Sequence, residues 1–211
     1  MQKKISDRGY LDRNKTVATR EAIELFLIVC EGEKTEPNYF QSFPLPQYAI
    51  DVRGLGTNPQ NLVRKALKIS REEGEYDSVW CVFDRDSWKA DDFNGAITYA
   101  EKNGIKVAYS NEAFELWYLL HFDYRDTAMS REDYKSALTE KLRKAGLISS
   151  KERYRKNSEN MYEMLEKKQS KAIQNARTLL KQYNPPSPAD DNPSTTVHLL
   201  VEQLNRFVRG N

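Results

Sequence analysis

The sequence predicts an α/β fold, in which a mainly parallel sheet carries helices on both faces and a helical C-terminal appendage follows. Short apolar runs alternate four times with segments of helical spacing up to about residue 122, and this alternation is typical of parallel sheets. From residue 131 onward the spacing is helical only. We therefore expect an N-terminal extension (1–21), an α/β core (22–126), a basic helical appendage with a proline-rich loop (127–193) and a C-terminal helix on the core (194–211).

Each element of the core has a local signal. Strands are expected at 24–30, 48–52, 78–83 and 105–109, where runs of β-branched and aromatic residues are bounded by polar ones. Thr35 is placed to cap a short helix that Pro37 enters in its first turn. Asn58 is expected to cap the next helix, with Pro59 at its first position. Two further helices are expected at 92–102 and 112–122.

The appendage and the last helix have helical spacing. Helices are expected at 134–145 and 161–183, joined by the basic stretch 151–156, and the proline-rich loop 184–193 follows. The final helix has an apolar stripe along one face, which predicts that it docks onto the core. Its members are Val197, Leu200, Val201, Leu204, Phe207 and Val208.

Composition excludes several classes of protein. The chain is 39% hydrophobic and 30% charged, which is typical of a polar, water-soluble globular protein. No apolar run approaches the roughly 20 residues needed to span a bilayer, and the first residues contain no signal-peptide core. We therefore expect a cytoplasmic protein without membrane contact, in which Cys30 and Cys81 are inert buried thiols.

Charge is distributed unevenly along the chain. Residues 131–183 contain 14 Lys and Arg against 7 Asp and Glu, which leaves 19 basic and 24 acidic residues elsewhere. An acidic core beside a basic arm suits a metal-dependent enzyme that acts on a polyanion such as nucleic acid. The alternative is that the basic stretch is simply a solvated helical face.

Acidic residues follow two of the predicted core strands. Glu31 comes directly after the first strand, and Asp84 and Asp86 end the third. The carboxyl ends of neighbouring parallel strands form the ligand crevice of such sheets, so we expect these carboxylates to converge. Three hard oxygen ligands without cysteine or histidine nearby suit Mg²⁺ or Mn²⁺. The alternative is an acidic loop with capping roles, for which Asp86 is well placed.

Further polar residues are expected to line the same crevice. Ser110 and Asn111 follow the fourth strand, and Glu115 lies one helical turn beyond Glu112. Glu115 is a candidate metal ligand or water-positioning base, and Ser110 or Asn111 a phosphate contact or a helix cap. Lys34 is placed either to neutralise the scissile phosphate or to pair with Glu33. The turn 54–58 is a weaker candidate for phosphate binding through its backbone.

The basic stretch is the candidate nucleic-acid surface. Arg153, Arg155 and Lys156 surround Tyr154, and such mixtures of basic and aromatic side chains hold nucleic-acid backbones and stack bases. The alternative is a helical hairpin whose tyrosines pack on the core. His121 and His198 have no Ser or Cys partner pattern, so a triad hydrolase is not expected. No Walker-type phosphate loop occurs in the sequence.

Six segments of the chain carry a family resemblance. They are Leu27–Phe40 (LIVCEGEKTEPNYF), Trp80–Asp86 (WCVFDRD), Tyr109–Trp117 (YSNEAFELW), Leu119–Phe122 (LLHF), Tyr154–Lys156 (YRK) and Asn192–Val197 (NPSTTV). In this order they resemble the RloB family of Toprim-like proteins, which are associated with restriction-modification and phage-defence loci. The resemblance covers nearly the whole chain. At one position the family often has proline and this chain has Glu112, whose role is left open.

The resemblance implies a function. In Toprim domains the glutamate after the first strand and the Asp-x-Asp after a later strand bind Mg²⁺, roles that fall here on Glu31, Asp84 and Asp86. We therefore expect a Mg²⁺- or Mn²⁺-dependent nuclease acting on DNA or RNA, tRNA included, in anti-phage defence such as abortive infection. The alternative is a non-catalytic or partner-gated effector, because RloB-like proteins resemble those encoded beside an ATPase. The sequence does not decide the oligomeric state, and a homodimer is one arrangement considered.

Overall fold

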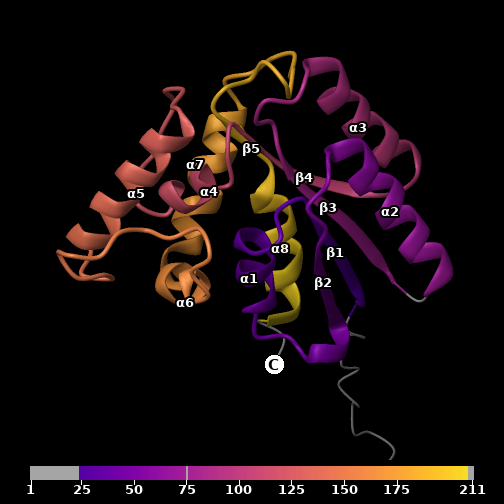
Figure 1. Ribbon diagram of the computed structural model, residues 1–211, viewed down its shortest axis with the longest axis horizontal. Helices are drawn as coiled ribbons and strands as arrows, with labels where there is room; N and C mark the ends of the chain where they lie inside the picture. The colour runs from indigo at the N-terminus through magenta and orange to yellow at the C-terminus, as the bar shows by residue number, and fades with distance from the viewer. Residues whose placement is uncertain (1–23, 75, 209–211) are drawn as a thin grey trace, which may run out of the picture.

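A five-stranded sheet forms the centre of the protein (Figure 1). The computed structural model describes residues 24–74 and 76–208, so the extension expected at 1–21 lies outside the described residues. The strand order is β2-β1-β3-β4-β5, with β5 antiparallel to β4 and the other neighbours parallel. The α/β prediction is therefore confirmed. The strands are β1 (Phe26–Cys30), β2 (Ile50–Gly54), β3 (Ser78–Asp84), β4 (Lys106–Asn111) and β5 (Ser194–Thr195).

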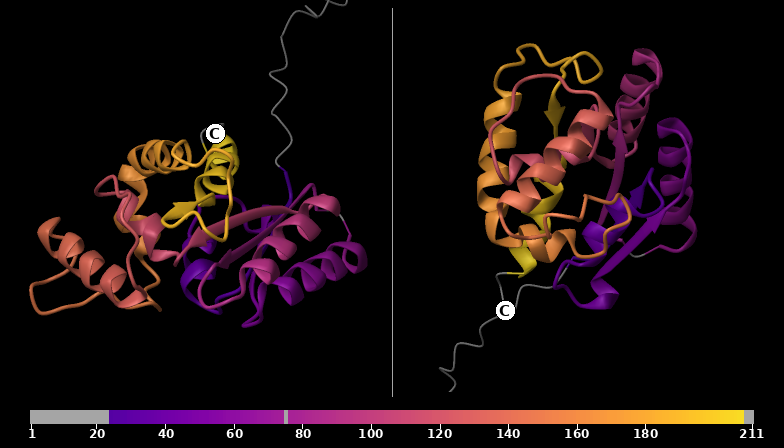
Figure 2. Two further views of the ribbon diagram at one scale, coloured as in Figure 1. Left: turned by 90° about the horizontal axis from the view of Figure 1, so that it is seen from above. Right: turned by 60° about the vertical axis from the view of Figure 1, so that its left-hand side comes forward.

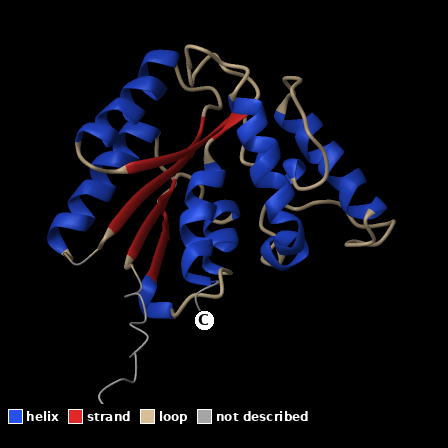
Figure 3. Ribbon diagram, turned by 180° about the vertical axis from the view of Figure 1, so that it is seen from behind, coloured by secondary structure: helices blue, strands red, loops and turns tan. Residues whose placement is uncertain are grey.

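Helices cover both faces of the sheet (Figures 1 and 3). Alternate residues of a strand point to opposite faces, so Leu27 and Val29 of β1 pack against one helical layer and Phe26 and Ile28 against the other. The first layer consists of α2 (Pro59–Glu72) and α3 (Ala90–Lys102). The second consists of α1 (Thr35–Gln41), α4 (Glu115–Leu120), α7 (Gln169–Leu180) and α8 (Val197–Val208).

The basic appendage extends this second layer away from the sheet (Figure 2). It contains α5 (Arg131–Lys144), α6 (Met161–Leu165) and the 3₁₀ helix η2 (Glu166–Lys168), which leads into α7. Its buried residues Tyr134, Leu138 and Leu142 join the same apolar cluster as α4 and α7. The appendage therefore shares the hydrophobic core of the α/β unit, and this shared packing fixes the position of its basic loop.

The last helix packs across the centre of the sheet. The ring of Phe207 in α8 meets Phe26 of β1 edge-on, with the centroids 5.7 Å apart. Gln203 Oε1 accepts a hydrogen bond from Trp80 Nε1 of β3 at 3.2 Å. The predicted apolar stripe is the buried face of this helix, since Val197, Leu200, Val201 and Leu204 are all fully buried.

Several expected boundaries differ from those of the structure, and three of the differences have a clear cause. β2 begins at Ile50 because a 3₁₀ turn, η1 (Gln47–Ala49), precedes it. β4 continues through Asn111 because β5 pairs with its last two residues, so α4 begins at Glu115 and not at Glu112. The helix expected over 161–183 is divided into α6, η2 and α7. Asn58 and Pro59 do begin α2 as predicted, and Asn58 Oδ1 accepts the Asn61 N–H. The expected cap at Thr35 is wrong, because Thr35 is the first residue of α1 and its hydroxyl donates to Lys156 O.

Cys30 and Cys81 are both buried, free thiols on adjacent strands, as expected. Burial raises the pKa of both thiols, which keeps them protonated and unreactive. Within the described ranges, no helix has both the length and the apolar character needed to cross a membrane.

Candidate active site

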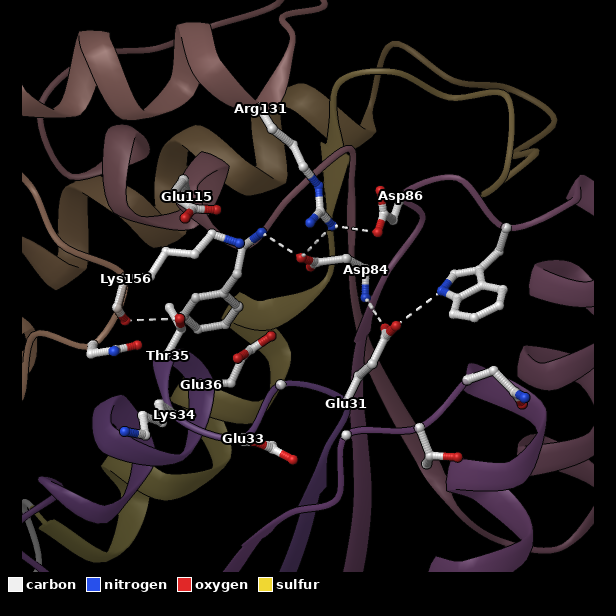
Figure 4. A pocket seen from close by; sticks show the side chains of 17 residues that line it. Glu31, Glu33, Lys34, Thr35, Glu36, Asp84, Asp86, Glu115, Arg131 and Lys156 are labelled. Atoms are coloured by element: carbon white, nitrogen blue, oxygen red, sulfur yellow. Dashed lines mark hydrogen bonds and ion pairs between the residues drawn. The ribbon is translucent and has the colours of Figure 1, made fainter.

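A cavity of about 640 Å³ opens at the carboxyl ends of β1 and β3, and carboxylates dominate one side of it (Figure 4). Glu31 follows β1, Asp84 ends β3, and Asp86 lies two residues further on. Glu36 of α1, Glu115, the first residue of α4, and the exposed Glu33 also line the cavity. The structure therefore brings the predicted residues Glu31, Asp84, Asp86 and Glu115 to one cavity.

Strand pairing explains why Glu31 lies beside Asp84. β1 and β3 are parallel neighbours, and the Glu31 N–H continues their ladder by donating to Val82 O at 2.8 Å. Glu31 Oε2 then accepts the Asp84 N–H at 3.1 Å, and Oε1 accepts Trp88 Nε1–H at 2.9 Å. Both oxygens of Glu31 are thus oriented by fixed donors, so its position is determined by the sheet and by the loop after β3.

Asp84 and Asp86 share one cationic partner, Arg131, the first residue of α5. Arg131 Nη2 lies 3.6 Å from Asp84 Oδ2 and 3.1 Å from Asp86 Oδ2. Asp84 Oδ2 also accepts the Phe114 N–H at 3.1 Å, just before α4. The guanidinium group therefore offsets part of the repulsion between two carboxylates that are close in sequence. This contact also ties the appendage to the end of β3.

Glu36 contributes a carboxylate almost without solvent contact, with 6% of its surface exposed. A side chain at Gly32 would collide with it, because a Cβ there would lie 2.1 Å from Glu36 Oε2. Gly54 is similarly constrained, since its Cβ would lie 2.6 Å from Gly32 O. These glycines let the β1 and β2 loops approach closely enough to enclose the carboxylate.

Glu115 is held from the basic appendage. Tyr154 Oη donates a hydrogen bond to Glu115 Oε1 at 3.2 Å, and both side chains are buried. Neighbouring carboxylates and burial raise the pKa of the Tyr154 hydroxyl, burial being the larger cause. Tyr154 is therefore the protonated donor that fixes Glu115.

Burial and mutual repulsion raise the pKa of three carboxyl groups of this cavity, those of Asp84, Glu31 and Glu36. Burial, followed by the charges of Glu36 and Glu115, raises the pKa of Asp84 well above its usual range, and Arg131 opposes this only in part. Burial likewise raises the pKa of Glu31. For Glu36, burial and the charges of Glu115 and Glu31 raise the pKa to about 7. Ionised together, these groups require a compensating cation.

Basic residues occupy the rim of the cavity at different positions. Lys156 lines it, and its charge lowers the pKa of Glu36, against the larger effect of burial. Lys34 also lines it, but is exposed and directed away from the carboxylates, as Figure 4 shows. Arg153 and Arg155 line a neighbouring cavity. Thr57, from the turn that was a weaker phosphate-binding candidate, forms part of the wall.

Ser110 and Asn111 do not line this cavity. They belong to β4, where Ser110 Oγ lies 3.1 Å from Thr195 Oγ1 and Asn111 Nδ2 donates to Ala189 O at 3.1 Å. The alternative role as a helix cap is wrong, because Phe114 precedes α4 and the strand continues through both residues. Glu112, whose role was left open, accepts the Asp86 N–H through its backbone carbonyl.

Three residues of the site were missed by sequence reasoning. Glu36 stands five residues after Glu31, at the second position of α1, and a second acid in the strand-to-helix turn is the signal that could have indicated it. Arg131 and Trp88 have no such local signal. Trp88 meets Glu31 across 57 residues of chain, and Arg131 reaches Asp84 and Asp86 only because α5 packs on α4.

The donor set fits a hard divalent cation. Carboxylate oxygens are the preferred ligands of Mg²⁺ and Mn²⁺. Burial, followed by the charges of neighbouring carboxylates, raises the pKa of Asp84 and of Glu36, and a cation bound there would favour their ionised forms. In the arrangement that the described residues adopt, no three side chains of Asp, Glu, His or Cys are close enough to hold an ion. Arg131 lies on the oxygens of Asp84 and Asp86 and competes for them.

Comparison with known proteins gives one family. A family model described as RloB-like protein matches residues 26–204, which include every described strand and the whole cavity. Neither the curated proteins nor the solved structures give a match.

Proposed function

The chain belongs to the RloB-like family, and on that premise we propose that it is a nuclease that hydrolyses phosphodiester bonds of DNA or RNA with Mg²⁺ or Mn²⁺. The observation that carries the proposal is the convergence of Glu31, Asp84 and Asp86 at the ends of two adjacent parallel strands. The proposal includes a cytoplasmic role in anti-phage defence, for which the family resemblance is the support.

Six charged residues of the cavity have a role in this proposal. Glu31, Asp84 and Asp86 would hold the divalent cation, which when bound supplies charge stabilisation at the phosphate and activates the attacking water. Glu115, oriented by Tyr154, would position that water. Lys156 faces the carboxylates across the cavity and would offset the charge of the phosphate. Lys34, which is exposed at the entrance, would contribute a second positive charge toward the substrate.

A partner-gated form of this activity is the second candidate, and one observation favours it. Arg131 ion-pairs with two of the proposed metal ligands and is supplied by the appendage. A partner that drew the Arg131 side chain away from the cavity would withdraw this guanidinium group and leave the two carboxylates to a cation. An ATPase encoded nearby is the partner that the family resemblance implies.

The test is metal-dependent cleavage by the full chain. Plasmid, single-stranded DNA and total tRNA would be offered with Mg²⁺ or Mn²⁺ to the wild type and to Asp84→Asn, which keeps an acceptor for the Phe114 N–H. We expect the variant to lose activity by on the order of a hundredfold or more. Asp91→Asn is the matched control, because Asp91 is exposed at the start of α3.

The outcomes separate the two candidates. Cleavage lost in Asp84→Asn and retained in Asp91→Asn supports the nuclease and identifies its substrate. Full cleavage by Asp84→Asn contradicts the proposed site. No cleavage by either protein, together with Mn²⁺ binding that Asp84→Asn abolishes, supports the partner-gated form, and adding the partner ATPase should then restore cleavage.

A further inference from the structure

A second cavity of about 710 Å³ lies beside the carboxylate cavity. Lys156 and Asn157 line both, so the two cavities share one wall. The second cavity is formed by the loop that joins α5 to α6, together with residues of these helices. Figure 1 shows the path of this loop. A polymer that extends beyond the carboxylates on the side of Lys156 would therefore enter it.

The floor of this second cavity is apolar. It is lined by Leu142 of α5, Ile148 of the following loop, and Met161 and Met164 of α6. Leu142 and Met161 are buried in the core, whereas Ile148 and Met164 are half-buried and open to the cavity. Methionine is flexible and polarizable and makes favourable contacts with aromatic rings. The floor can therefore receive a flat aromatic group such as a nucleobase.

The rim of the cavity is cationic. Arg153, Arg155 and Lys156 line it and are exposed to solvent. Two carboxylates, Glu152 and Glu159, also line the cavity, so the rim carries an excess of one positive charge. Glu152 accepts the Ser149 N–H at 2.7 Å. Three cations above an apolar floor suit an anion attached to an aromatic ring, which is the chemistry of a nucleotide.

The loop that carries these cations is held in place on both sides. Arg143 Nε donates to Glu152 O at 2.8 Å, and Thr139 Oγ1 accepts the Tyr154 N–H at 3.1 Å, so α5 fixes one end. Thr35 Oγ1 of α1 donates to Lys156 O at 2.8 Å and fixes the other end. The second cavity is thus preformed next to the proposed catalytic centre, and little ordering is needed when a ligand binds.

We propose that this cavity, named here the flanking subsite and defined by Leu142, Ile148, Met164, Arg153 and Arg155, binds an unpaired nucleotide next to the phosphodiester held at the carboxylates. The proposal rests on the proposed nuclease function and extends it, because it names single-stranded nucleic acid as the substrate form. The base packs on the apolar floor, and the adjacent phosphates contact the two arginines. A base inside a duplex is stacked and paired and cannot enter the cavity.

The test measures binding apart from cleavage. Fluorescence anisotropy would follow labelled single-stranded DNA and RNA oligonucleotides of about ten nucleotides, and abasic counterparts with the same phosphates, on the full-length Asp84→Asn protein in EDTA. Two variants are made in this background. The double variant Arg153→Gln/Arg155→Gln removes two positive charges from the rim, and Met164→Ala removes apolar surface from the floor. Lys151→Gln is the charge control because Lys151 is exposed in the same loop outside the cavity, and Leu199→Ala is an exposed apolar control on α8.

We expect the two kinds of variant to act differently. The arginine double variant should weaken the binding of intact and abasic oligonucleotides alike. It should also reduce the magnitude of the slope of log affinity against log salt concentration by about 1.4, or about 0.7 for each phosphate that an arginine no longer neutralises. Met164→Ala should lower the affinity for the intact oligonucleotides by about two- to tenfold and leave the affinity for the abasic ones unchanged. Neither control should change affinity. Ile148→Ala provides an independent floor variant if Met164→Ala unfolds, as judged by circular dichroism.

Some results would overturn the proposal. If both floor variants keep the parent's ratio of affinity for intact and abasic oligonucleotides, no base binds on the floor. If Lys151→Gln weakens binding as much as the arginine double variant does, the two arginines do not form a specific phosphate contact. If the wild type still cleaves nucleic acid in either case, the flanking subsite alone is wrong. If the parent protein binds no oligonucleotide, and the wild type neither cleaves nucleic acid nor binds Mn²⁺, both proposals fail.

Discussion

Arg131 Nη2 lies 3.1 Å from Asp86 Oδ2, which joins the first residue of α5 to the loop after β3. The Arg131 side chain is about one third exposed, as is that of Asp86. The same guanidinium group is 3.6 Å from the nearly buried Asp84. A single residue of the appendage thus partly neutralises two carboxylates at the end of the central strand, so the appendage and the carboxylate site are electrostatically coupled.

Removal of this guanidinium group should tighten cation binding. In Arg131→Gln, Asp84 and Asp86 lose their partner, and a divalent cation no longer competes with it. We expect Mn²⁺ affinity to increase by about tenfold or more, as measured by calorimetry or by the thermal shift that Mn²⁺ produces. Lys135→Gln is the control, because Lys135 lies on the same helix and pairs only with Glu132 among the described residues. Equal Mn²⁺ affinities in the two variants would exclude the competition.

The hydrogen bond between Tyr154 and Glu115 should stabilise the fold as well as orient the carboxylate. Tyr154→Phe keeps the ring but removes the donor from Glu115, which is only 2% exposed. We expect the free energy of unfolding to fall by about 1–2 kcal/mol, as measured by urea unfolding. Tyr99→Phe, at an exposed position of α3, should have no effect. An unchanged stability in Tyr154→Phe would show that Glu115 does not depend on this donor.

The close approach at Gly54 predicts a large effect from a small substitution. A Cβ at this position would lie 2.6 Å from Gly32 O and 2.7 Å from the Glu33 Cα, so Gly54→Ala must move backbone. We expect a loss of about 1–3 kcal/mol in the free energy of unfolding. The same substitution at Gly95 in α3 meets only Gln60 Nε2, at 4.0 Å, and should stabilise the protein by about 0.5–1 kcal/mol. If both substitutions changed the free energy of unfolding in the same direction, the close approach at Gly54 would not be the cause.

Both histidines should make stability depend on pH. Burial is the main cause that lowers the pKa of His121 and of His198 to about 4, from an ordinary value of 6.5. Because the unfolded chain binds these protons more readily, the stabilisation is complete above pH 6.5 and is lost as the pH falls to 4. Each histidine therefore accounts for roughly 3 kcal/mol across this range.

Urea unfolding at pH 7 and pH 5 tests this dependence. Glu36 acts in the opposite direction, since its raised pKa makes the folded state lose stability as the pH rises from 4.5 to about 7. The informative quantity is therefore the difference between parent and variant. His121→Gln and His198→Gln should each lose less stability than the parent between pH 7 and pH 5. Parallel profiles for parent and variants would contradict the lowered pKa values.

The core of the fold could be predicted from the sequence because its signals are local. The apolar runs of β1 and β3 can only be buried between two helical layers. The start of α2 is defined by Asn58 and Pro59, which are neighbours in the chain. The positions of Glu31, Asp84 and Asp86 followed from the same logic. Parallel strands place their carboxyl ends at one edge, so acids that follow two adjacent strands must lie close together.

Local patterns in the chain were sufficient to predict the α/β class and the carboxylates at the ends of its strands, whereas the partners of these side chains depend on how the chain folds. Arg131 reaches Asp84 and Asp86 because α5 packs on α4, and Tyr154 reaches Glu115 because the basic loop is fixed to α1. β5 pairs with the end of β4 across more than 80 residues and keeps Ser110 and Asn111 out of the cavity. Strand and helix signals depend on neighbouring residues in the chain, but these contacts depend on packing between distant segments, which no local pattern encodes.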